Sequence, residues 1–110
     1  MELRQALPKI VTETVPGPKS KALIDRRVAA TATAVKCVYP VAIERGEGAM
    51  VEDLDGNIFL DWVGGVGVLN VGYSQPEIIE AVKAQSEKYF HGMFNIVTHE
   101  AVSYTHLRAH

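Results

Sequence analysis

A run of glycines near the middle of the chain is the most promising place for chemistry. Unshielded backbone N–H groups can cradle a phosphate, and four glycines lie within residues 63–73: Gly64, Gly65, Gly67 and Gly72. A G-x-G-x-x-G motif starting at Gly65 has asparagine in place of its third glycine, and no Gly-Lys-Ser/Thr follows. The spacing therefore argues against a phosphate loop. It predicts a sharply turning, apolar connection that packs against another surface.

Few other residues could act as nucleophiles or metal ligands. Cys37 is the one cysteine, which excludes an internal disulfide and a cysteine zinc cluster. Because no histidine is paired with it in the sequence pattern, we expect Cys37 to be a buried apolar residue. His91 and His99 are too far apart to bind a metal from one helix, so each is expected to make a polar contact. These residues provide no catalytic group and no metal site.

A pair of carboxylates, Asp53 and Asp55, could suggest calcium binding. An EF-hand would need its glycine directly after Asn57, where isoleucine stands, and a bidentate glutamate at a spacing that this chain lacks. Asp55 is instead followed by Gly56, and Asp-Gly is a strong signal for a tight hairpin turn. We therefore interpret residues 54–57 as a turn between two strands.

Strands are expected around this turn, because apolar and polar residues alternate there and β-branched and aromatic residues are frequent. The predicted strands cover residues 41–46, 49–53 and 58–62. The last of them leads directly into the glycine run. A small antiparallel sheet should therefore position the glycines.

Helices are predicted before and after the sheet. Residues 1–19 form an arm whose prolines prevent a continuous helix, although its apolar residues could lie against another surface. Ser20 can cap a helix over residues 21–33, in which apolar residues recur every three or four positions. After the glycines, Ser74-Gln75-Pro76-Glu77 fits the S-x-x-E capping box of an amphipathic helix that runs to about Phe90. The chain is thus a mixed α/β segment.

Composition places the chain among globular proteins and excludes several partners. Its 110 residues are 47% hydrophobic and 22% charged, and 11 Lys+Arg against 13 Asp+Glu give a net charge of −2. Because there is no basic block, we expect no nucleic-acid partner. The longest uncharged stretch, between Asp61 and Glu77, is broken by glycines and a proline, so no membrane span is predicted. The first residues lack the apolar core of a secretory signal, and a cytoplasmic location is expected.

Residues 46–62, with residues 63–73 and Pro76 behind them, resemble the amino-terminal region of class III aminotransferases. The shared pattern combines an Asp-Gly hairpin, an aspartate–aromatic pair, a double-glycine loop and a helix begun by proline. The likeness covers roughly residues 19–100 and is nearest to the 4-aminobutyrate aminotransferases. These enzymes have fold type I and use pyridoxal 5'-phosphate.

The resemblance implies a fold and a domain organisation. Fold type I is an α/β architecture, of which this chain alone would show an α+β part. Residues 1–19 would form the amino-terminal arm. Residues 20–101 would be the amino-terminal part of the small domain and the start of its link to the large domain.

Residues 102–110 depart from the family, whose chains continue into another helix. They resemble the translation of a transposase adapter used to prepare sequencing libraries, and Ala101 would then be encoded partly by the adapter. We therefore expect a non-native tail on an amino-terminal fragment. The alternative is a natural terminal helix whose two histidines make polar contacts or bind a metal.

The resemblance also implies roles within the glycine run. Gly64 and Gly65 would lie at the dimer interface beside the active site. Val66 would line the substrate pocket, where an aliphatic side chain shapes the space around a methylene chain. Tyr73 stands where the family often has histidine, which leaves the exact substrate open. The family's Schiff-base lysine and its ring-binding residues would lie beyond this chain, so none of its residues is expected to be catalytic or to bind the cofactor.

The implied activity belongs to a longer parent enzyme. A homodimeric aminotransferase would use pyridoxal 5'-phosphate to move an amino group from an ω-amino acid such as 4-aminobutyrate to 2-oxoglutarate. The fragment by itself would be inactive. One alternative is another class III specificity, for acetylornithine or another ω-amino donor. A second is a stand-alone interaction module that binds a partner through the arm and the glycine run.

Overall fold

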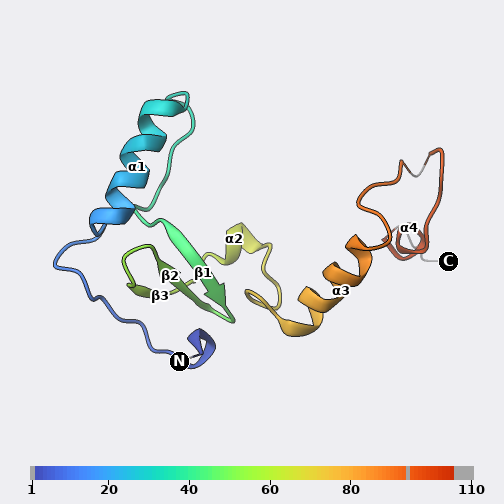
Figure 1. The fold of residues 1–110 in the computed structure, drawn as a ribbon, viewed down its shortest axis with the longest axis horizontal. Helices are drawn as coiled ribbons and strands as arrows, with labels where there is room; N and C mark the ends of the chain where they lie inside the picture. Colours follow the sequence, from blue (N-terminus) through green and yellow to red (C-terminus); the bar gives the residue numbers. More distant parts are fainter. Residues whose placement is uncertain (1, 94, 106–110) are drawn as a thin grey trace. The chain divides into compact units, whose positions relative to one another are not determined.

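The computed structural model describes residues 2–93 and 95–105, so residues 106–110 of the predicted tail lie outside the described part (Figure 1). The chain divides into two compact units, one ending at Gln75 and the other starting at Pro76. Each unit is described by itself. Within the described residues, no helix is long and apolar enough to cross a membrane.

The first unit is built around a three-stranded antiparallel sheet in the order β1-β2-β3. Its elements are the 3-10 turn η1 (Leu3–Gln5), α1 (Pro18–Ala30), β1 (Ile43–Glu47), β2 (Met50–Asp53), β3 (Ile58–Leu60) and the short α2 (Gly64–Gly67). The second unit contains α3 (Pro76–Ser86) and α4 (Glu100–Thr105). The predicted mixture of helices with a small antiparallel sheet is confirmed, although the strands are shorter than expected.

The turn between β2 and β3 is stabilised by two buried polar side chains. Asp53 accepts hydrogen bonds from the backbone N–H groups of Asp55 (2.9 Å) and Asn57 (2.8 Å) through one carboxylate oxygen. Its other oxygen accepts a hydrogen bond from the Asn57 side-chain amide at 2.8 Å. Gly56 has φ 87°, a left-handed value that a glycine adopts without strain. The predicted hairpin turn at residues 54–57 is therefore confirmed.

The amino-terminal arm lies against this hairpin. The Asn57 side-chain oxygen accepts hydrogen bonds from the backbone N–H groups of Val11 (2.8 Å) and Thr12 (3.2 Å) and from the Thr12 hydroxyl (3.0 Å). Lys9 and Ile58 exchange two backbone hydrogen bonds of 2.8 Å, so the arm pairs with the start of β3. Leu3 is buried, and η1 packs against β1 and β2. The apolar side chains of Leu7, Ile10, Val11 and Val15 are exposed, because this part of the arm is held mainly through its backbone.

Helix α1 begins and ends earlier than the predicted span 21–33. Its N-cap residue is Gly17 and not Ser20, which lies buried inside the first turn. The Asp55 carboxylate, from the hairpin turn, accepts hydrogen bonds from the backbone N–H groups of Lys19 (2.9 Å) and Ser20 (2.8 Å). A carboxylate from a distant segment thus accepts hydrogen bonds from the free N–H groups at the helix start. Proline is tolerated at position 18, the first helical position, because an N–H there would have no partner in the helix.

Helix α3 is also shorter than predicted, beginning at Pro76 and ending at Ser86 rather than near Phe90. Ser74 has φ 51°, whereas an N-cap residue has extended backbone, so the predicted capping box does not describe this helix start. Farther along the second unit, the rings of Tyr89 and His99 lie 5.9 Å apart between their centroids.

The prediction for Cys37 is wrong, because its side chain is exposed. Residues 31–40 form no strand and are all exposed. The Cys37 thiol donates a hydrogen bond to the Tyr39 carbonyl at 3.1 Å. Without a strand, nothing in this segment carries the side chain into the core.

Asn57→Ala should open the contact between the arm and β3. The substitution removes the acceptor for three donors of the arm, and each buried group left unpaired costs about 1–3 kcal/mol. We expect the backbone N–H groups of Lys9 and Ile58 to exchange with deuterated water at least about tenfold faster, as followed by NMR. The matched control is Asn70→Ala, at an exposed asparagine outside this contact. Unchanged exchange in Asn57→Ala would contradict the assignment.

Candidate functional site

The candidate site is the segment that follows β3, residues 63–73, which we call the glycine loop. It begins with α2, a short turn whose backbone is left-handed at four successive residues. The φ angles are 55° at Gly64, 62° at Gly65, 63° at Val66 and 79° at Gly67. Three of these residues are glycines, which adopt positive φ at no steric cost. The predicted sharp turn is confirmed.

Val66 is the exception within this turn. A left-handed conformation costs an L-residue roughly 1–2 kcal/mol, and a β-branched side chain is rarely found there. Its N–H donates a hydrogen bond to the Val63 carbonyl at 3.0 Å, which helps to hold the turn. The side chain is 87% exposed. The loop thus presents a strained aliphatic residue to its surroundings, and such strain is concentrated at functional sites.

Asp61 anchors the beginning of the glycine loop. One carboxylate oxygen accepts hydrogen bonds from the backbone N–H groups of Val63 (2.7 Å) and Gly64 (3.0 Å). The other oxygen accepts a hydrogen bond from the Tyr73 hydroxyl at 2.7 Å. Because Asp61 precedes the loop and Tyr73 ends it, this carboxylate closes the loop across its base.

The end of the glycine loop is fixed to the turn between β1 and β2. Gly48 and Tyr73 exchange backbone hydrogen bonds of 2.9 and 2.8 Å. A Cβ atom on Gly72 would lie 2.5 Å from the Gly48 carbonyl oxygen, and one on Gly46 would lie 2.7 Å from the Tyr73 ring. Glycine at both positions is therefore required for this close approach.

Hydrogen bonding between Asp61 and Tyr73 shifts the pKa values of both groups. The hydrogen bond from Tyr73 and those from the loop N–H groups together lower the pKa of Asp61 against a smaller opposing effect of burial. The hydrogen bond to Asp61, burial and the carboxylate charge raise the pKa of Tyr73 to about 12. At neutral pH, Asp61 is therefore a charged acceptor and Tyr73 a protonated donor. This pair holds the loop and does not form a nucleophile with its base.

A shallow hollow lies beside this anchored loop. Gly64, one of the expected site residues, lines it together with Asp61 and Tyr73, and the other lining residues are Gly48, Ala49, Leu69, Asn70, Val71 and Gly72. No lysine is among them. The Asp61 carboxylate uses two of the loop N–H groups, and its charge would repel a phosphate. These residues therefore fit neither the Schiff-base linkage nor the phosphate of pyridoxal 5'-phosphate.

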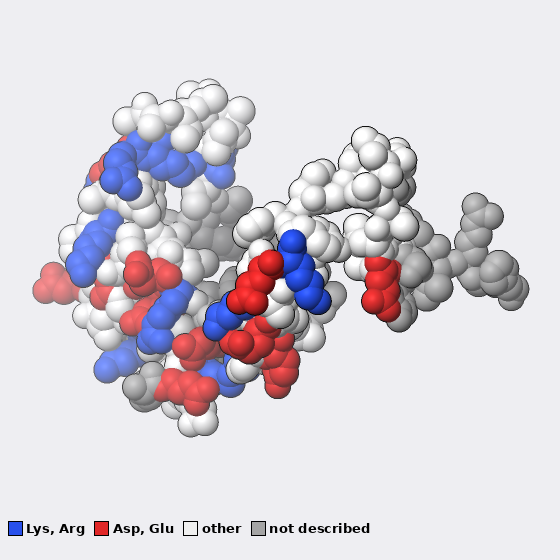
Figure 2. All heavy atoms as spheres, turned by 45° about the vertical axis from the view of Figure 1, so that its right-hand side comes forward, with Lys and Arg blue, Asp and Glu red and all other residues white. Residues whose placement is uncertain are grey.

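The surface against which the apolar glycine loop is expected to pack is not supplied by the described residues. The four valines of the loop are exposed: Val63, Val66, Val68 and Val71. These side chains stay uncovered, since residues 9–12 of the arm and the start of α1 lie against the hairpin turn at the other end of β3. Figure 2 shows Lys and Arg side chains interspersed with Asp and Glu on the drawn face of the first unit, as the small net charge suggests. An uncovered apolar loop can shape a pocket or pack against another chain.

Sequence reasoning missed the residues that hold the loop. Asp61 was part of a family pattern but had no role, and the spacing of twelve residues to Tyr73 matches no local motif. Arg4 and Gln75 also contact each other near the end of the loop, at 3.0 Å. A charged residue in the arm gives no signal of such a contact, because the fold alone brings these segments together.

Comparisons with known proteins agree on one family. The sequence model of the family "Aminotransferase class-III" matches residues 30–107. An alanine/serine racemase of Pyrococcus horikoshii is 39% identical over 90% of this chain and 19% of its own. A 4-aminobutyrate aminotransferase of Mycobacterium tuberculosis is 39% identical over 84% of this chain and 20% of its own. The crystal structure of acetylornithine aminotransferase from Elizabethkingia anophelis matches with a TM-score of 0.59 and 32% identity, over 63% of this chain and 17% of that one. The chain thus spans about a fifth of the length of these relatives.

Replacing Val66 by glycine should stabilise the folded chain or leave it unchanged. Glycine removes the left-handed strain, which offsets the added freedom of the unfolded chain. Val68 is the matched control, since it is an exposed valine of the same loop with φ −86°. There, glycine should destabilise the chain by about 0.5–1 kcal/mol. Urea unfolding compares the two variants, and equal losses would show that Val66 is not strained.

The Asp61–Tyr73 contact should hold between two pH limits. The stabilisation that depends on ionised Asp61 is present above the ordinary pKa of 3.8. It is lost as the pH falls through the lowered pKa that Asp61 has in the folded chain. The contribution from Tyr73 is present below about pH 10 and is lost as the pH rises through about 12.

NMR titration of the Tyr73 ring and the Asp61 carboxyl measures both limits. We expect Asp61→Asn to move the Tyr73 midpoint from about 12 toward 10. Tyr73→Phe should raise the Asp61 midpoint, because it removes the largest cause of the lowered pKa. A Tyr73 midpoint that is the same in wild type and Asp61→Asn would contradict the coupling.

Proposed function

The chain belongs to the class III aminotransferase family, and from this premise we propose that it is the amino-terminal segment of an aminotransferase. The intact enzyme would move an amino group from an ω-amino acid, of the size of 4-aminobutyrate, to 2-oxoglutarate. It would work as a homodimer in the cytoplasm. The identity to a 4-aminobutyrate aminotransferase over 84% of the chain supports this donor class.

The observation that carries the proposal is the exposed Val66 on a rigidly anchored turn. A pocket for a methylene chain needs an aliphatic surface at a fixed position, and Asp61 and Tyr73 fix this turn at its base. We assign Val66 to the wall of the donor pocket. Gly64 and Gly65, which lack side chains, would let the dimer partner approach the loop closely. The chain's residues 1–19 and 20–101 would be the arm and the start of the small domain.

Pyridoxal 5'-phosphate would be held by residues outside this chain. When bound, the cofactor supplies the electron sink for transferring the amino group. The hollow beside the glycine loop is lined by no lysine and offers no free cradle of backbone N–H groups for a phosphate. The described residues would therefore shape the substrate pocket and exclude donors that do not fit it, and would take no part in the reaction. We therefore expect the 110-residue chain by itself to be inactive.

Three other functions have specific support. The structural match to an acetylornithine aminotransferase supports a different ω-amino donor. The exposed valines of the loop are also compatible with a stand-alone module that binds a protein partner. The racemase relative adds a reaction that needs no amino acceptor, so acceptor dependence has to be measured.

The test uses the protein encoded by the assembled locus. We expect the reading frame to continue past Glu100 without residues 102–110 and to include a downstream lysine. The purified product, with pyridoxal 5'-phosphate, should convert 4-aminobutyrate only when 2-oxoglutarate is present, as measured by glutamate formation. Val66→Ala should lower kcat/KM for the donor by at least about tenfold, because it removes two methyl groups from an apolar pocket.

Several controls separate the alternatives. Faster turnover of acetylornithine than of 4-aminobutyrate would identify acetylornithine as the preferred amino donor. Loss of amino-acid chirality without an acceptor would indicate racemisation. Val68→Ala should leave the donor KM unchanged, because Val68 lies on the helical end of the turn. The 110-residue chain should give no saturable absorbance change with the cofactor. A natural stop codon after His110 would overturn the proposed longer enzyme and favour the interaction module.

A further inference from the structure

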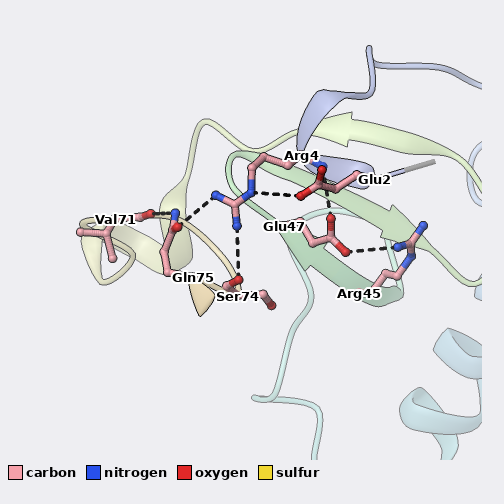
Figure 3. Close-up of polar contacts among 7 residues, drawn as sticks. All are labelled: Glu2, Arg4, Arg45, Glu47, Val71, Ser74 and Gln75. Atoms are coloured by element: carbon pink, nitrogen blue, oxygen red, sulfur yellow. Dashed lines mark hydrogen bonds and ion pairs between the residues drawn. The ribbon is translucent and has the colours of Figure 1, made fainter. Parts of the chain in front are cut away.

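Arg4 links the amino terminus of the chain to the end of the glycine loop (Figure 3). Its guanidinium donates one hydrogen bond to the Gln75 side-chain oxygen at 3.0 Å and another to the Ser74 carbonyl at 3.3 Å. The Gln75 amide in turn donates a hydrogen bond to the Val71 carbonyl, inside the loop. Two segments separated by about seventy positions in sequence are thus joined through one side chain.

The same arginine also lies against the turn that pairs with the loop. A Cβ atom on Gly48 would come within 3.2 Å of the Arg4 Cγ, so the aliphatic part of Arg4 covers this glycine. Gly48 exchanges both backbone hydrogen bonds with Tyr73. Arg4 therefore contacts both sides of the pairing that fixes the loop: it packs on Gly48 and bonds to the residues directly after Tyr73.

Arg4 is itself held in a defined position. It lies on η1, beside the buried Leu3, and its backbone N–H donates a hydrogen bond to the Glu47 carboxylate at 3.3 Å. Glu47 also forms an ion pair with Arg45 at 3.4 Å. The ion pair between Arg4 and Glu2 is long, 3.9 Å, and exposed, so it contributes little. The directed hydrogen bonds to Gln75 and Ser74 are what distinguish Arg4 from an ordinary surface arginine.

We propose that Arg4 is a positioning residue for the glycine loop, and that the arm is an ordered part of the site rather than a flexible extension. The planar guanidinium donates in two directions at once, to a side-chain amide and to a backbone carbonyl, which a lysine ammonium on a flexible stem reproduces poorly. Through Gln75 and Val71, Arg4 sets where the loop ends. Through Gly48 and Tyr73, it stabilises the base from which Val66 projects.

The test of the contact uses the 110-residue chain and needs no activity. Arg4→Met keeps the aliphatic part over Gly48 but removes both donors. We expect the backbone N–H groups of Gly48 and Tyr73 to exchange with deuterated water at least about fivefold faster, and the Val71 resonances to shift. The Leu54 N–H, bonded to the Ala42 carbonyl at 3.0 Å, is the internal reference and should change little. Arg26→Met, at an exposed arginine of α1, is the matched control.

Two further variants make the result decisive. Gln75→Glu keeps an acceptor for Arg4 but loses the donor to Val71, so it should shift Val71 without affecting Gly48. In Arg4→Met with Gln75→Met, the two effects should not add, because both changes break one chain of hydrogen bonds. If Arg4→Met does not fold, Arg4→Lys gives the same measurement with a smaller expected change. Unchanged exchange at Gly48 and Tyr73, or an equal acceleration at Leu54, would overturn the proposal.

The catalytic consequence of this contact rests on the proposed function and is measured separately. In the intact enzyme, Arg4→Met should raise KM for the amino donor several-fold while kcat stays within about twofold, with partial recovery in Arg4→Lys. A several-fold lower kcat with an unchanged KM would contradict a positioning role. An intact protein without transaminase activity would refute the proposed function, whereas the exchange experiment would still decide the role of Arg4.

Discussion

The buried Asn57 side chain is the contact on which the first unit depends. Its amide donates to Asp53 inside the hairpin turn, and its oxygen accepts three hydrogen bonds from the arm. The neighbouring Asp55 then meets the start of α1. A turn of four residues therefore does more than connect two strands, because it satisfies polar groups of the arm and of the helix that precede the sheet. Since buried polar groups are costly when unpaired, this arrangement fixes the relative positions of all three segments.

The glycine loop depends on a similar arrangement at the opposite end of the sheet. Asp61 directly follows β3, and its carboxylate accepts hydrogen bonds from the first N–H groups of the loop and from the hydroxyl of Tyr73, the last residue of the loop. The backbone pairing of Tyr73 with Gly48 is possible because Gly46 and Gly72 leave room for it. The two ends of the hairpin thus differ, because one holds residues 9–12 of the arm and the start of α1, whereas the other, with Arg4 beside it, presents a strained loop.

Local signals in the sequence predicted the elements but not the contacts between them. The Asp-Gly turn, the three strands and the sharp bend of the glycine run follow from residue types within a few positions of each other. The errors at the starts of α1 and α3 arise where a group distant in sequence decides the local backbone. Ser20 was predicted as the helix cap, but Asp55 supplies the carboxylate and the helix starts at Pro18. Likewise, the pairing of Tyr73 with Gly48 fixes the backbone just before Ser74, and the φ angle of Ser74 is then not the extended one that an N-cap residue has. Arg4 and Tyr73 could not be assigned for the same reason, since their partners are 70 or 12 positions away.

The strain at Val66 also bears on what lies outside the described residues. Glycine occupies positions 64, 65 and 67, where it adopts the left-handed backbone at no steric cost. Glycine at position 66 would form the same turn without strain. Valine there costs free energy and, with its side chain 87% exposed, gains almost nothing from the described chain. A contact outside the described chain can offset that cost. Such a contact must be apolar, close to the loop and fixed in position, which are the properties of a substrate's methylene chain in a pocket or of a tightly packed partner surface.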